Sequence, residues 1–229
     1  MLEKKMKKKL LTLILIITLV FTSVGVISFA QTDDIESMIS EMSLRDKITQ
    51  MFMMEFRQWG DENLTKMNNQ VKKIVTDYNF GAIIFFANNI KETEDTYKLT
   101  QDFQQAAITD GGIPMIIATD QEGGMVFRLG SGTALPGNMA LAATGDKNNA
   151  YKAGCIIGSE LASLGINTTL APVIDINNNP NNTVIGLRSF SDKADIVGNY
   201  GAKMIEGINK YNVIAVSYTH LTLPTKSLV

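Results

Sequence analysis

Short apolar runs alternate with amphipathic helical patterns along most of this chain. The runs are rich in isoleucine, valine and phenylalanine, which is typical of strands buried on both faces. No two-residue turn signal joins one run directly to the next, so the pattern does not indicate hairpins. The alternation predicts an α/β fold in which helices cover a parallel sheet of about five strands. The expected strands are residues 50–55, 80–86, 114–119, 167–175 and 213–216. Two short helices are expected after Asp33, and a capping box at Ser43–Asp46 opens the second of them. The longer expected helices are residues 63–78, 93–109, 146–164 and 193–210.

One of these strands ends at a charged turn, in the segment Pro-Met-Ile-Ile-Ala-Thr-Asp-Gln-Glu-Gly-Gly-Met-Val-Phe-Arg at residues 114–128. Asp120 stands where the apolar run stops, and Arg128 follows after a turn that contains Gly123 and Gly124. The glycines permit backbone conformations that a side chain would forbid. An acceptor-only carboxylate beside a guanidinium with five donors suits a polyhydroxylated ligand. The two residues could equally form an ordinary surface ion pair, and spacing alone leaves both interpretations open.

Two further polar residues follow the next strand. Asp175 ends that strand, and Arg188 lies in the long loop after it. In an eightfold barrel, the loops after all strands gather on one face, so we expect both residues to converge with Asp120 and Arg128. Alternatively, Asp175 only caps a loop and Arg188 only stabilises one through an ion pair.

The sequence gives little support for a metal ion or a nucleotide cofactor. Asp120, Glu122 and Asp175 could hold a hard cation, but no histidine or second dense carboxylate cluster accompanies them. The glycine pairs at 111–112 and 123–124 lack the spacing of a dinucleotide-binding or phosphate-binding loop. We therefore expect neither a cofactor nor a metal.

Residues 1–30 have the pattern of an export signal. Five lysines precede an apolar or small stretch from Leu10 to Ala30, and Ser28-Phe29-Ala30 suits a signal peptidase that cleaves before Gln31. The stretch is also long enough to serve as an uncleaved anchor. We expect a secreted or cell-surface protein.

The remaining residues are acidic and contain one cysteine. The whole chain has 21 basic and 23 acidic residues. Residues 1–30 hold five lysines and one glutamate, which leaves 16 against 22 and a net charge of about −6. This balance argues against nucleic acid or anionic lipid as partners. Cys155 lies in an apolar helical pattern, which indicates a buried small side chain and not a reactive thiol.

Four motifs, in this order, closely resemble glycoside hydrolase family 3, and its β-N-acetylhexosaminidase branch in particular. They are Asp120-Gln-Glu-Gly-Gly124 with Arg128, Leu135-Pro-Gly-Asn138, Ala171-Pro-Val-Ile-Asp175, and Ile185-Gly-Leu-Arg-Ser-Phe190. The resemblance implies a TIM (β/α)8 barrel, of which this chain would hold about the first five βα units, over residues 31–216. It implies hydrolysis of terminal β-linked N-acetylglucosamine with retention of configuration. The family also contains β-glucosidases, so a glucoside remains an alternative substrate.

The resemblance also implies roles for three residues. Asp120 and Arg128 match residues that bind hydroxyls of the terminal sugar, and Arg188 matches an arginine that contacts the substrate. The implied substrates are oligosaccharides of the peptidoglycan or chitin type.

The family pattern stops after Val216. Family members continue with a Lys-His-Phe-Pro-Gly-His-Gly type of loop that carries the acid/base, and their nucleophilic aspartate lies on a later strand. Here residues 217–229 read Ser-Tyr-Thr-His-Leu-Thr-Leu-Pro-Thr-Lys-Ser-Leu-Val, with His220 as the one histidine of the chain. We predict that residues 217–229 are unrelated to the family and come from an artefact of sequence assembly. Retaining hydrolysis needs both a nucleophile and a proton donor, so we expect this chain to be inactive or only to bind sugar.

Overall fold

The computed structural model describes residues 30–179 and 181–219. The described residues divide into two units, with the boundary between Lys47 and Ile48. Helix α2 (Ala30–Glu41) lies in the first unit, and helix α3 (Leu44–Thr49) begins there. The hydroxyl of Ser43 accepts a hydrogen bond from the backbone N–H of Asp46 at 3.1 Å, which confirms the predicted capping box at the start of α3.

Two predictions concern residues outside the described part of the chain. The predicted export signal falls on residues 1–29 and Ala30, of which only Ala30 is described. Most of the predicted tail, including His220, lies beyond residue 219. Within residues 30–179 and 181–219, no helix has the length and apolar character needed to cross a membrane.

Five parallel strands form the main sheet of the second unit. Their order in the sheet is their order in the chain, without the reversal that marks a doubly wound sheet. This arrangement confirms the predicted α/β fold and is that of consecutive βα units of a TIM barrel. The strands are β1 (Met53–Met54), β4 (Ala82–Phe85), β5 (Ile116–Thr119), β6 (Thr168–Thr169) and β7 (Ile214–Ala215).

The second unit also contains a hairpin that the sequence pattern did not indicate. Strands β2 (Gln58–Trp59) and β3 (Glu62–Asn63) pair antiparallel around Gly60, whose φ of 64° is favoured by glycine. The predicted helix start at residue 63 is therefore wrong. Helix α4 (Asn69–Tyr78) begins after Asn68, whose side chain accepts a hydrogen bond from the N–H of Val71.

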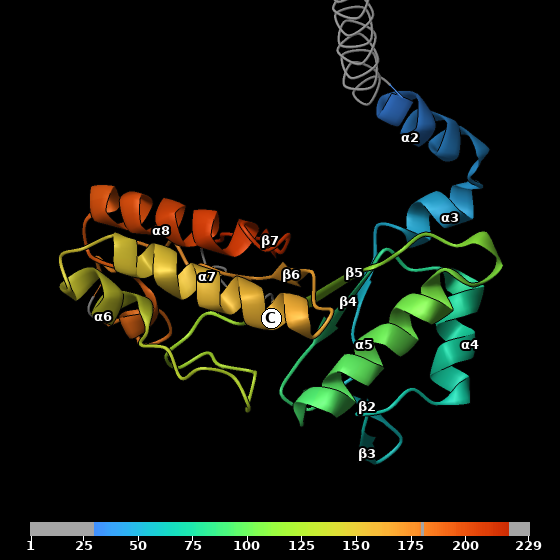
Figure 1. Ribbon diagram of the computed structural model, residues 1–229, viewed down its shortest axis with the longest axis horizontal. Helices are drawn as coiled ribbons and strands as arrows, with labels where there is room; N and C mark the ends of the chain where they lie inside the picture. Colours follow the sequence, from blue (N-terminus) through green and yellow to red (C-terminus); the bar gives the residue numbers. More distant parts are fainter. Residues whose placement is uncertain (1–29, 180, 220–229) are drawn as a thin grey trace, which may run out of the picture. The chain divides into compact units, whose positions relative to one another are not determined.

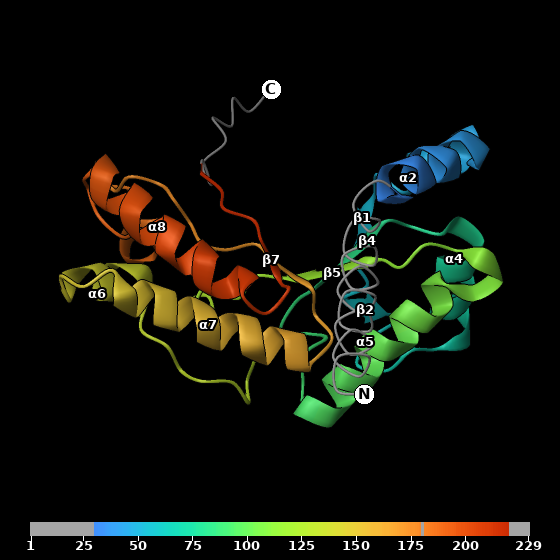
Figure 2. The same ribbon diagram turned by 45° about the horizontal axis from the view of Figure 1, so that its top comes forward.

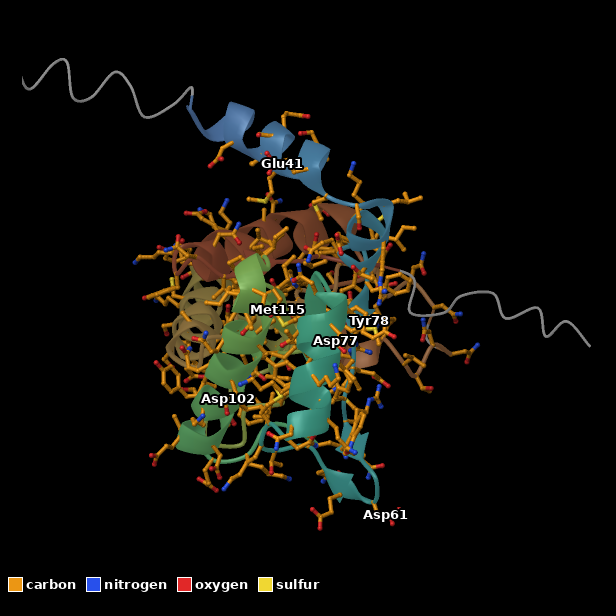
Figure 3. The ribbon with its side chains drawn as sticks, turned by 90° about the vertical axis from the view of Figure 1, so that its right-hand side faces the viewer. Glu41, Asp61, Asp77, Tyr78, Asp102 and Met115 are labelled. Atoms are coloured by element: carbon orange, nitrogen blue, oxygen red, sulfur yellow. The ribbon has the colours of Figure 1, made fainter. Side chains whose placement is uncertain are left out.

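Helices α4 and α5 (Thr93–Ala107) lie side by side, as Figure 3 shows with Tyr78 at the end of α4 and Asp102 on α5. Phe103 of α5 packs edge to face against Phe85 of β4, with ring centroids 5.5 Å apart. Both rings are almost completely buried. This aromatic contact joins the helix layer to the sheet.

Helices α7 (Asn148–Ser163) and α8 (Ala194–Asn209) form a second closely packed pair (Figures 1 and 2). Glycines make the close approach possible: a Cβ added to Gly154 would lie 2.2 Å from the carbonyl oxygen of Met204. A Cβ on Gly207 would lie 2.2 Å from the carbonyl oxygen of Tyr151. Cys155, on the same stretch of α7, is partly buried.

The carboxyl ends of the strands meet at one rim of the sheet. The register pairs Phe85 with Thr119, Thr119 with Thr169, and Thr169 with Ala215. The residues that follow these strands are therefore neighbours, and Asp120 is one of them. This is the rim at which α/β barrels build their sites.

Candidate functional site

A cavity of about 460 Å³ lies at this rim. Three residues predicted to bind substrate, Asp120, Arg128 and Arg188, all line it. Their predicted convergence is confirmed, although they come from two separate loops. Asp175 was predicted to converge with them but is not among the lining residues, and its backbone carbonyl accepts a hydrogen bond from the hydroxyl of Ser189 at 2.6 Å. The other lining residues are Glu122, Val126, Leu170, Val216 and Tyr218.

The loop after β5 folds back on itself and brings Arg128 to Asp120. The side-chain oxygen of Gln121 accepts hydrogen bonds from the backbone N–H groups of Arg128 at 2.7 Å and Leu129 at 3.3 Å. Gln121 is fully buried, so its amide serves as an internal brace of the loop. Arg128 Nη2 then lies 3.5 Å from Asp120 Oδ2, with both side chains partly exposed to the cavity. Sequence reasoning did not single out Gln121.

The glycine pair in this loop has the conformational role predicted for it. Gly123 and Gly124 have φ angles of 86° and 60°, a region that side chains disfavour. A Cβ on Gly124 would lie 2.6 Å from the Cα of Gly137, just before helix α6 (Asn138–Ala143). The loop can therefore lie directly against the start of α6 because residue 124 has no Cβ.

A buried ion pair joins this loop to the loop after β6. Arg188, at the end of a short 3-10 helix (Gly186–Arg188), donates from Nε to Glu122 Oε2 at 2.9 Å and from Nη2 to Glu122 Oε1 at 2.6 Å. The two side chains are 13% and 2% exposed. The hydrogen bond to Glu122 is the main reason why the pKa of Arg188 lies above its ordinary value. Arg188 is thus both an ion-pair partner and a residue of the cavity wall.

Tyr218 completes this network. Its hydroxyl donates to Glu122 Oε1 at 2.7 Å and accepts from Arg188 Nη2 at 2.8 Å. Burial raises the pKa of the Tyr218 phenol, and its hydrogen bond to Glu122 adds to that effect. The backbone of Tyr218 also accepts a hydrogen bond from the N–H of Ile174 at 2.9 Å. At least this residue of the predicted tail therefore lies in the wall of the cavity.

The groups around Asp120 shift the pKa of its carboxyl in opposite directions. Burial raises the pKa of its carboxyl above the ordinary value of 3.8, Arg128 lowers it, and the carboxylate of Glu122 raises it. The result is a net increase, so the fold disfavours the charged form. Among the described residues, no three histidine, cysteine, aspartate or glutamate side chains are grouped so as to hold a metal ion. The cavity offers a carboxylate acceptor and guanidinium donors between apolar walls.

Comparison with known proteins points to one family. The model of the glycosyl hydrolase family 3 N-terminal domain matches residues 43–221, which extends beyond Val216. Beta-hexosaminidase A of Pseudoalteromonas piscicida is 35% identical over 182 residues, covering 72% of this chain and 30% of that protein. The beta-N-acetylglucosaminidase/beta-glucosidase of Cellulomonas fimi is 36% identical over 103 residues, covering 45% of this chain and 18% of that protein.

A solved structure gives the same result. The family 3 beta-N-acetylglucosaminidase from Paenibacillus sp. str. FPU-7 is similar with a TM-score of 0.72 and 40% identity, over 77% of this chain and 33% of that chain. The chain therefore spans about a third, or less, of the length of these proteins.

Glu122→Gln should destabilise the protein strongly. The substitution leaves the buried guanidinium of Arg188 facing a neutral amide, and breaking a buried pair in this way costs about 3 kcal/mol. Asp77→Asn is the matched control, because it neutralises an exposed pair with Lys73 and should cost about 0.5 kcal/mol or less. Urea unfolding followed by circular dichroism measures both. Equal, small losses in the two variants would contradict a structural role for the Glu122–Arg188 pair.

Asp120→Asn should stabilise the protein in a pH-dependent way. The folded-state pKa of Asp120 lies above the unfolded value of 3.8, so the unfolded state binds fewer protons as the pH rises through this range. The charge on Asp120 is therefore a cost that is absent below about pH 3.8 and grows as the pH rises through the folded-state pKa. In unfolding experiments between about pH 4 and 7, the free energy of unfolding of the variant should exceed that of the parent by an amount that increases with pH. A constant difference across this range would be inconsistent with the raised pKa.

Proposed function

Because this chain belongs to glycosyl hydrolase family 3, we propose that the cavity at Asp120, Arg128 and Arg188 binds the terminal sugar of a β-linked N-acetylhexosaminide. The observation that carries the proposal is the convergence of one carboxylate and two guanidinium groups on a single cavity. Hydrogen bonds to charged groups are stronger than neutral ones, and a sugar presents hydroxyls that both donate and accept. The names of the relatives, beta-hexosaminidase and beta-N-acetylglucosaminidase, support the choice of sugar.

The proposed roles of the three residues differ. The two oxygens of Asp120 accept hydrogen bonds from neighbouring hydroxyls, and Arg128 donates from the adjacent position. Arg188 uses Nε and Nη2 on Glu122 and Tyr218, and its Nη1 makes only a long contact of 3.4 Å to the Val184 carbonyl. Nη1 is therefore the group of Arg188 that would serve the sugar.

The proposed reaction of the full-length protein is hydrolysis of the glycosidic bond with retention. That reaction needs a carboxylate nucleophile and a proton donor on opposite sides of the scissile bond. The family resemblance assigns both groups to motifs that these 229 residues do not contain. We therefore expect this chain to supply the sugar-binding part of the site and to bind without hydrolysing.

The proposed substrates are oligosaccharides of the peptidoglycan or chitin type, met outside the cell. The signal-like pattern of residues 1–30 supports this placement. A β-glucoside is the second candidate, because the Cellulomonas fimi relative is named for both activities.

Calorimetric titration of the 229-residue chain with N-acetylglucosamine should give saturable binding. Arg128→Ala should weaken it at least about tenfold, since a hydrogen bond to a charged donor contributes about 1.5–3 kcal/mol. Arg45→Ala, which removes an exposed arginine from α3, is the control and should leave the affinity unchanged. Titration with glucose ranks the two candidate sugars. Absence of binding, or equal binding by the Arg128 variant, would refute the proposed site.

The same chain should release no chromophore from an aryl β-N-acetylglucosaminide. The physical reason is the missing nucleophile and proton donor, without which binding alone does not break the bond. A spectrophotometric assay over hours provides the measurement, with Asp120→Asn as the control for contaminating enzyme. Turnover that disappears in the Asp120 variant would show that the chain contains catalytic groups of its own.

A further inference from the structure

Part of the proposed sugar cavity is apolar, and the proposed hydrogen bonds to hydroxyls leave that part without a role. The apolar residues of the lining are Val126, Leu170 and Val216, and Tyr218 lies among them. The remaining lining residues carry charges. A cavity of this composition suits a ligand that has both a polar rim and an apolar face.

The strand ends bring most of these apolar residues to one rim. Strand β6 lies between β5 and β7 in the sheet. Leu170 directly follows β6 and Val216 directly follows β7. Tyr218 stands two positions after Val216 and pairs with Val173 in an isolated parallel bridge. Side chains two positions apart on an extended segment point to the same side, which agrees with the place of both Val216 and Tyr218 in the cavity lining.

Tyr218 is held at both ends of its side chain. Its backbone N–H donates to the carbonyl oxygen of Pro172 at 3.3 Å, and its carbonyl oxygen accepts from the N–H of Ile174 at 2.9 Å. Its hydroxyl donates to Glu122 at 2.7 Å and accepts from Arg188 at 2.8 Å. The position of the ring between these anchors is therefore set before any ligand arrives, which reduces the entropy that binding would cost.

The ring carbons are the part of Tyr218 that remains available to a ligand. The hydroxyl proton and one acceptor position are already used within the protein. The residue is partly exposed, and within residues 30–179 and 181–219 no aromatic ring or cation stacks on it. An aromatic ring that lines a cavity and has no stacking partner can bury apolar surface against a ligand.

We propose that the ring of Tyr218 packs against the C–H face of the terminal sugar while Asp120 and Arg128 bind its hydroxyls. The inference rests on the proposed function, because it takes this cavity as the sugar site. A pyranose ring carries its hydroxyls around the rim and C–H groups on its faces, so one sugar can use the charged and the apolar lining at once. The family resemblance does not supply this contact, since family members have a Lys-His-Phe-Pro-Gly-His-Gly type of loop where this chain has Ser217 and Tyr218.

Proton NMR during titration of the 229-residue chain with methyl β-N-acetylglucosaminide tests the contact directly. Protons above an aromatic ring are shielded, so the ring protons of the sugar should move upfield when it binds. Tyr218→Leu should abolish this shift and weaken binding about fivefold, because it removes the ring but keeps an apolar side chain. Tyr218→Phe keeps the ring, so it should keep the shift and bind more tightly than Tyr218→Leu. Tyr211→Leu, at an exposed tyrosine outside the cavity, is the matched control and should change neither quantity.

The outcomes separate this contact from the sugar site itself. If calorimetry detects no binding by the parent chain, the proposed sugar site is wrong and the Tyr218 contact is wrong with it. If the sugar binds but its ring protons do not move upfield, or if the shift survives in Tyr218→Leu, the sugar site stands and the Tyr218 contact is overturned. Equal losses of affinity and shift in Tyr218→Phe and Tyr218→Leu would assign the effect to the hydroxyl and would also overturn the ring contact. Circular dichroism verifies that each variant is folded.

Discussion

The geometry of the site depends on the buried ion pair between Glu122 and Arg188. These residues are 66 positions apart in the chain, and their two short hydrogen bonds fasten the loop after β5 to the loop after β6. A buried pair of this kind adds little net stability, because the loss of hydration offsets the attraction between the charges. Its value here is geometric: a planar guanidinium bound at two points to a fixed carboxylate has one orientation. That orientation fixes Arg188 in the wall of the Asp120 cavity.

The charge on Asp120 lowers the stability of the fold at this site. Its carboxyl is partly buried, close to the carboxylate of Glu122, and the single guanidinium at 3.5 Å does not restore its ordinary pKa. A residue selected for stability alone would be neutral at this position. Perturbed groups in clefts are often functional, although structural networks perturb pKa values too. The raised pKa agrees with a ligand-binding role, since hydrogen bonds from hydroxyls would stabilise the charged form that the fold disfavours.

The sequence predicted the ends of β4 and β5 to within one residue, but it placed the end of the next strand at Asp175, whereas β6 ends at Thr169. Contacts between loops were predicted less well. Asp120 and its glycines could be located because a buried strand, a turn and a charge succeed one another within a few residues. Glu122 could not be identified as the partner of Arg188, since periodicity contains no information on contacts between distant loops. The hairpin at Gln58–Asn63 was missed although Gly60 is a turn signal, because its strands are only two residues long. The family resemblance chose between alternatives that spacing left open for Arg128 and Arg188.

The proposed sugar site would be selective for the hydroxyls of its ligand. A site that hydrogen-bonds hydroxyls rejects a ligand that lacks one, because its own charged groups are then buried without partners. The Asp120 cavity, with charges on two sides, belongs to this class. An apolar pocket discriminates weakly, by about 1–3 kcal/mol for each methylene gained or lost. The proposed site would therefore recognise the terminal sugar strictly, since its selectivity comes from charged groups and not from an apolar wall.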